Sequence, residues 1–277
     1  MEVNLKTNCR MAFIGLHPKD LAYKKLLQNG LQDSFGISCK PEDLNAVAGP
    51  FELKQIINKL KPEHYQVGEK LRANFHLHTI ASDGRLTPKE FLEQCTSYAN
   101  RVFKSGKIND DLPAFSAAIT DHDRIESSQE VIALISQEPG KYKNFKFVAG
   151  CEFLLHGYKE PHPAFEAVGL GFNPFDKALE TMMKGFASNN QVSDIPKIKN
   201  AGGILSWAHP IVTPDKINDD FFEFLKKYGI DGVEGNYQYN RWDKEYVNSI
   251  KPMLEKLIKK FKMFVTGGTD CHTKSLF

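Results

Sequence analysis

Histidine and carboxylate side chains recur at characteristic spacings along this chain of 277 residues. Two histidines alternate in His76-Leu77-His78, and an aspartate and a histidine alternate in Asp270-Cys271-His272. Because successive side chains of a strand point to opposite faces, each such pair points to one side of an extended segment. Imidazole nitrogens and carboxylate oxygens together suit zinc, manganese and iron. These spacings indicate a metal site.

Further residues of the same types follow other short apolar runs. The full set of candidate ligands from these positions is His76, His78, Asp83, His122, Glu152, His209, Asp270 and His272. A tetrahedral site takes about four ligands, so this number indicates two or three divalent ions, with Zn, Mn and Fe as candidates.

Alternating strand and helix patterns provide the elements that would position these residues. Runs typical of strands lie at 74–78, 115–120, 145–152, 165–172, 204–208, 232–236 and 263–266. Helical spacing occurs at 87–102, 126–137, 175–187, 219–228 and 242–260. Such alternation predicts an α/β fold with a parallel sheet, closed into a seven-stranded barrel. The candidate ligands follow the strands, and active sites of β/α barrels lie at the carboxyl ends of their strands.

The first part of the chain lacks the strand patterns of the rest. We therefore expect a helical extension over residues 1–70, ahead of a barrel over 71–277. Pro41 starts one helical segment, a helix is expected to end near Gly30, and Ile56, Ile57 and Leu60 have helical spacing. This extension either packs on the barrel or serves as a lid or partner-binding module.

Composition limits the classes of function. Lys and Arg number 36 against 34 Asp and Glu, a net charge of +2, which gives no support for a nucleic-acid partner. The five cysteines include no C-x-x-C pair, which argues against disulfide frameworks and zinc fingers and predicts a cytoplasmic protein. No apolar run reaches the ~18–20 residues of a membrane span, so no membrane partner is expected. The oligomeric state stays open.

Five segments together resemble the motifs of the PHP superfamily, named for polymerase and histidinol phosphatase. They are HLHTIASDG at 76–84, TDHD at 120–123, GCE at 150–152, AHP at 208–210 and GTDCH at 268–272. The resemblance covers about 72–272, is closest to small stand-alone PHP phosphatases, and implies a distorted (β/α)7 barrel. It also implies up to three ions, one held by His76, His78 and Asp270, a second by Asp83, His122 and His272, with Glu152 bridging and His209 helping to hold a third.

Two departures from these relatives concern the third ion and the substrate. Glu166 stands where they usually carry a histidine ligand; Glu166 is the expected replacement, with His162, His156 or no ligand as alternatives. An arginine that binds phosphate soon after the His-Pro motif in some nucleotide phosphatases is absent after Pro210.

The resemblance implies hydrolysis of a small phosphate monoester, a nucleotide being one candidate, by attack of a metal-bound hydroxide. Two neighbouring ions can lower the pKa of their shared water and bind phosphoryl oxygens. Asp121 and Asp123 are expected to assist catalysis by orienting imidazole rings, or else to cap a turn. Arg85, Arg124 and Arg241 are candidates for binding the substrate, with a plain surface role as the alternative.

Other functions stay open. Histidinol phosphate is an alternative substrate of the same class. A metal-binding PHP module without turnover, acting as a binding or regulatory scaffold, is the alternative of a different class. A nuclease would need a basic, aromatic groove, which the nearly neutral charge does not support.

Overall fold

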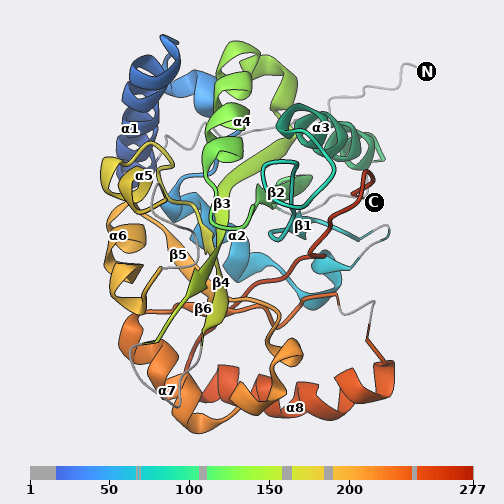
Figure 1. The fold of residues 1–277 in the computed structure, drawn as a ribbon. Coiled ribbons are helices and arrows are strands. Elements are labelled where there is room, and N and C mark those ends of the chain that lie inside the picture. Colours follow the sequence, from blue (N-terminus) through green and yellow to red (C-terminus); the bar gives the residue numbers. More distant parts are fainter. Residues whose placement is uncertain are drawn as a thin grey trace, which may run out of the picture.

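A seven-stranded sheet, in the order β1 to β7, forms the centre of the computed structural model (Figure 1). The structure describes residues 17–66, 68, 70–105, 111–157, 164–183, 190–238 and 242–276. The strands are β1 (Ala73–Asn74), β2 (Phe115–Ile119), β3 (Phe145–Leu155), β4 (Phe165–Leu170), β5 (Ile204–Trp207), β6 (Gly232–Val233) and β7 (Phe264–Val265). Each lies within or overlaps a run predicted from the sequence.

The sheet curls until its first and last strands meet just beyond their ends. The Phe75 amide donates to the Gly267 carbonyl at 3.1 Å, the Asp270 amide to His76 at 3.0 Å, and the His78 amide to Cys271 at 3.1 Å. These bonds join the two metal-ligand segments that follow β1 and β7. The expected distorted barrel is confirmed, with an irregular seam in place of a regular β1–β7 ladder.

Strand β4 corrects the expectation of an all-parallel barrel. It runs antiparallel to both β3 and β5, whereas the other neighbouring pairs are parallel. The link from Leu155 to Phe165 is shorter than the dozen or more residues that a parallel crossover needs. As a result, β4 begins at the rim where the other strands end, and Glu166 is its second residue.

Helices cover the outside of this sheet. They are α1 (Pro18–Phe35), α2 (Pro50–Lys59), α3 (Pro88–Lys104), α4 (Glu126–Gln137), α5 (Lys177–Met183), α6 (Ile195–Asn200), α7 (Asp219–Tyr228) and α8 (Lys244–Lys260). The α3 helix begins with a capping box, in which Thr87 and Glu90 satisfy each other's amides. The expected end of α1 near Gly30 was wrong, because Gly30 packs closely against the Phe175 ring and the helix ends at Gly36 in a left-handed conformation.

The N-terminal helices share the hydrophobic core of the barrel. Leu53 and Ile56 of α2 cluster with Phe75, Val168 and Ile204, which puts α2 against the barrel end opposite the rim. Helix α1 packs beside α4 (Figure 1). The extension therefore packs on the barrel, while the domain boundary near residue 70 stays a prediction. Within the described ranges, no helix combines the length and apolar character needed to cross a membrane.

Candidate metal centre

All the candidate ligands converge at the rim, in three groups whose nitrogen and carboxylate oxygen atoms lie within 4.8 Å of one another. The first group is His76, His78, Glu152 and Asp270; the second is His78, Asp83, His122 and His272; the third is Glu152, Glu166 and His209. His78 belongs to the first two groups, and Glu152 belongs to the first and third. The groups therefore form one continuous row of possible metal positions.

The first group lies deepest. His76 Nε2 is 3.0 Å from Glu152 Oε2, and His78 Nε2 is 3.0 Å from Asp270 Oδ1. The atoms His76 Nε2, His78 Nε2 and Glu152 Oε2 are all buried without a hydrogen-bond partner among the described residues. Buried polar atoms normally have partners, because leaving one unpaired is costly. Three such atoms facing one another fit a divalent cation.

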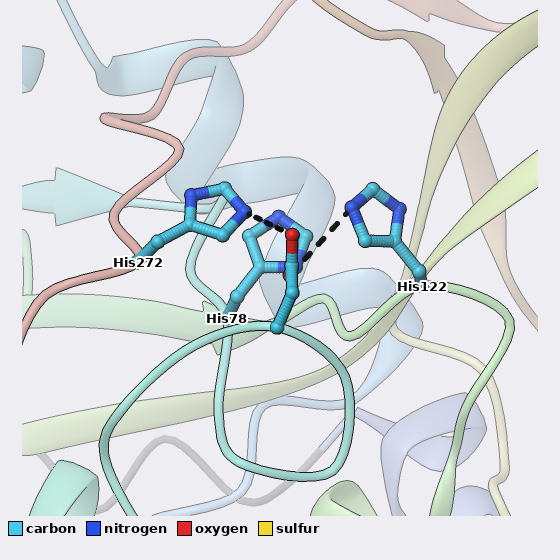
Figure 2. A group of neighbouring side chains, drawn as sticks. His78, His122 and His272 are labelled. Carbon is cyan, nitrogen blue, oxygen red and sulfur yellow. Dashed lines mark ion pairs between the residues drawn. The ribbon is translucent and has the colours of Figure 1, made fainter.

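The second group is open to solvent. Figure 2 shows the rings of His122 and His272 on either side of His78, turned toward a common point. Asp83 lies 3.1 Å from His272 Nε2 and 3.8 Å from His122 Nε2. The Asp83 side chain is 57% exposed and that of His122 is 39% exposed. Water or a substrate can therefore reach this end of the row.

The third group depends on the reversed direction of β4. His209 Nε2 lies 3.0 Å from Glu152 Oε1 and 3.3 Å from Glu166 Oε2. Glu166 reaches the rim because β4 starts there. The alternative His156 belongs to none of the three groups, although its Nε2 is buried without a hydrogen bond, and His162 lies outside the described residues.

The backbone is strained or tightly packed where the ligands converge. His209 and Asp270 have φ angles of 28° and 48°, a left-handed region that such residues seldom adopt. A Cβ atom at Gly268 would lie 2.4 Å from the Cβ of His76, so only glycine fits between the two strand ends. Strain of this kind collects at functional sites.

Opposite charges shift the pKa values within the row. Burial favours the neutral carboxyl of Glu152, but the nearby His76 ring and the hydrogen bond with His209 lower the pKa of Glu152 well below its usual value. Burial likewise favours a neutral His76 ring, yet Glu152 and Glu234 raise the pKa of His76 well above its usual value. The row therefore attracts positive charge, supplied either by protons or by metal ions.

Asp121 and Asp123 do not make the hydrogen bonds to imidazole rings that were expected. Asp121 is buried and accepts from the Thr79 amide and hydroxyl, both at 2.6 Å, and from Ser82 Oγ at 2.8 Å. Asp123 accepts from Asn190 Nδ2 at 2.6 Å and from the Leu154 amide at 3.3 Å. Neither carboxylate bonds to an imidazole within the described ranges. They flank His122 in the chain, but their side chains hold neighbouring loops.

Glu234 performs the orienting role and was missed in the sequence. Both its oxygens lie near His76 Nδ1, at 3.0 and 3.1 Å, and Oε2 also accepts from the His209 amide at 2.9 Å. It is fully buried. Tyr237 similarly donates to Asp270 Oδ2 at 2.8 Å. Position at a strand end could have identified Glu234, since it directly follows β6, but it belongs to none of the recognised motifs.

Two of the three candidate arginines lie among the described residues, and there neither side chain forms a hydrogen bond or an ion pair with the ligand row. Arg85 is exposed, and Arg124 is exposed with Nη1 3.9 Å from Glu126. Arg241 lies outside the described residues. Their role in binding a substrate stays a prediction.

No protein-family model and no curated protein matches the sequence. Among solved structures, a protein from Bifidobacterium adolescentis, inferred to be a metal-dependent phosphoesterase, has 17% sequence identity and a TM-score of 0.51. The match covers 74% of this chain and 89% of that one. An amidohydrolase from Chromobacterium violaceum, with bound sulfate and no metal, has 17% identity and a TM-score of 0.48, covering 73% and 88%. At this identity, the first match supports the fold.

Proposed function

We propose that this protein is a metal-dependent phosphoesterase, because its chain has the motifs and the barrel fold of the PHP superfamily. The observation that carries the proposal is the row of three ligand groups, with buried nitrogen and oxygen atoms that lack hydrogen bonds at its centre. The name given to the Bifidobacterium protein agrees with this assignment. The substrate proposed is a small phosphate monoester.

The buried and the exposed residues of the row have different roles. Divalent ions, when bound, would make water a better nucleophile at neutral pH and offset negative charge on a phosphoryl group. Glu152 is shared by two groups and so sets their separation. Glu234 holds the His76 ring, which leaves Nε2 of that ring facing the row. The exposed side chains of Asp83 and His122 mark the side from which a phosphate ester would approach.

The substrate is proposed to be small, because nothing in the charge of the chain favours a polymer. The net charge is +2, and the two described candidate arginines, Arg85 and Arg124, are exposed and follow Asp83 and His122 by two residues in the sequence. A guanidinium can hold a phosphate through two parallel hydrogen bonds. Either side chain could therefore bind a phosphate ester without moving buried structure.

The test is phosphate release by protein reconstituted separately with zinc, manganese or iron(II). The substrate panel would hold mononucleotides, histidinol phosphate, a sugar phosphate and an aryl phosphate. We expect release of phosphate from at least one substrate, and loss by orders of magnitude in Asp270→Asn. Asp111→Asn, an exposed acid outside the row, serves as the matched control. Tight metal binding without turnover on any substrate would instead favour the scaffold alternative.

A further inference from the structure

A cavity apart from the candidate metal centre lies between α2 and α8. Its volume is about 480 Å³, within the range of about 300–1,000 Å³ that small-molecule sites occupy. Residues from the end of α2, the C-terminal half of α8 and β7 form its walls. None of the nine candidate metal ligands lines it.

The cavity has apolar walls and a basic edge. Ile57, Ile258 and Met263 contribute buried apolar side chains. Lys259, Lys262 and Glu255 also line it and are exposed. Glu255 pairs with Lys251 at 3.9 Å, so the two lysines give this edge its positive charge. Neither lysine forms an ion pair with any residue of the described ranges, so both ammonium groups are available to a ligand.

Lys262 is also held in an unusual backbone conformation. Its φ is 50°, in the left-handed region that follows many helices and is usually filled there by glycine or asparagine. The dipole of α8 favours a basic last turn, which accounts for Lys259 and Lys260. The left-handed turn at Lys262 closes the helix, because the Met263 amide donates to the Ile258 carbonyl at 3.1 Å. Lys262 lies in this turn and lines the cavity.

From these features we infer that the cavity binds a small amphipathic anion, an apolar body with a single carboxylate or sulfonate-like head. The apolar body would fill the space beside Ile57 and Ile258, and the head would lie between Lys259 and Lys262. Both attractions are needed, because burial of apolar area supplies affinity and an exposed ion pair alone is worth little. This inference does not depend on the proposed function.

Calorimetric titration of the metal-loaded full chain with octanoate, octanesulfonate and 1-octanol tests the inference. We expect the two anions to bind once per chain and octanol to bind at least tenfold more weakly. Anion affinity should fall at least tenfold in the double variant Lys259→Ala/Lys262→Ala. The matched control is Lys244→Ala/Lys256→Ala, which removes two exposed charges from the same helix outside the cavity.

A second variant tests the apolar part. Asn58 is exposed and lines the cavity, so Asn58→Trp should fill its opening and abolish binding while both lysines remain. Thermal melts would verify that each variant is folded. Three results would overturn the inference: no saturable binding of either anion, binding unchanged in both the double-lysine and tryptophan variants, or octanol binding as tightly as octanoate.

Discussion

Glu234 accepts a hydrogen bond from the Nδ1 side of His76 and another from the backbone amide of His209. One buried carboxylate thus fixes two candidate ligands that belong to different groups. Its negative charge also favours a proton on Nδ1, which leaves Nε2 of His76 free to face a metal. This relationship makes Glu234 the strongest candidate for tuning the centre without touching a metal.

Replacing Glu234 with Gln should lower metal affinity and phosphate release by about 10–100-fold, the usual effect of removing such a partner. The amide keeps the size of the side chain but lacks its charge. Metal titration with a chromogenic chelator would measure affinity, and Glu223→Gln on the exposed face of α7 is the control. Unchanged affinity and rate in Glu234→Gln would contradict the role.

Eight of the nine members of the ligand row were predictable from the sequence because each lies at or near a strand end within a recognised motif. The ninth, Glu166, lies at the start of β4 and departs from the motif. Glu234 follows β6 in the same way, but a lone carboxylate in Gly232–Asn236 carries no local signal. The reversal of β4 was also missed, since alternating strand patterns do not encode direction. Only the short link before Phe165 indicated it. Residues held by long-range packing, such as Gly30 against Phe175, are likewise invisible to helix-end rules.

Asp121 is expected to support the second metal position through the loop between His78 and Asp83. Asp121→Ala would leave the buried Thr79 amide without its acceptor and would remove one of the partners of the Thr79 and Ser82 hydroxyls. Each unpaired buried donor costs about 1–3 kcal/mol. We expect lower stability toward urea and selective loss of the ion bound at the second group, while the first group stays filled. Equal loss of all ions would show that the loop has no local role.

Metal binding should release protons. The pKa values of His76, His78 and His209 are raised: burial opposes the charged rings, but nearby carboxylates outweigh it. A protonated imidazole must lose its proton to bind a metal, so affinity should increase as pH rises toward and through these raised values. Calorimetry in two buffers of different ionisation enthalpy would count the protons. No proton release at pH 6.5 would contradict the shifts.

The same pKa directions predict the stability of the metal-free protein. Because the pKa values of these histidines are higher in the folded state, their protonation stabilises the fold. This contribution is complete below the ordinary histidine pKa of about 6.5 and is lost as the pH rises through the pKa values of the folded state. Removal of metal with a chelator should therefore destabilise the protein more at pH 8 than at pH 6. A metal present at 100 times its dissociation constant contributes about 2.7 kcal/mol. Paired thermal melts with and without chelator would measure the difference.

Lys24 predicts a separate alkaline effect that does not involve the metals. It is buried on α1, and Nζ donates to Asn45 Oδ1 at 2.9 Å. Burial, together with nearby Lys146, lowers the pKa of Lys24 from 10.5 to about 8. Between these values the unfolded chain binds more protons than the folded one, so this residue makes stability rise with pH.

Replacing Lys24 with Met should remove this rise of stability with pH. The free energy of unfolding of the wild type minus that of the variant should increase from pH 8 to 10 in urea titrations of metal-free protein. Lys25→Met, exposed on the same helix, should leave this difference flat. A flat or falling difference for Lys24→Met would mean that the buried ammonium keeps its ordinary affinity for protons.

Glu166 is the position at which the chain departs from the PHP phosphatases that it resembles, and it is expected to bind the third ion. Its Oε2 lies 3.3 Å from His209 Nε2, in the group that also contains Glu152. A carboxylate in place of an imidazole favours harder cations, so manganese should gain relative to zinc at this position. Glu166→Ala should lower occupancy of the third site, measured by elemental analysis, with the first two ions retained.

Glu166→His provides the decisive comparison, because it restores a nitrogen ligand at the same place. We expect this variant to keep three ions while shifting preference from manganese toward zinc in competition experiments with equal concentrations of both metals. Glu180→Ala, a carboxylate on α5 away from the row, controls for loss of charge. If Glu166→Ala keeps its full metal content and rate, then His209 and the neighbouring Lys216 ammonium balance this carboxylate, and the third group holds no ion.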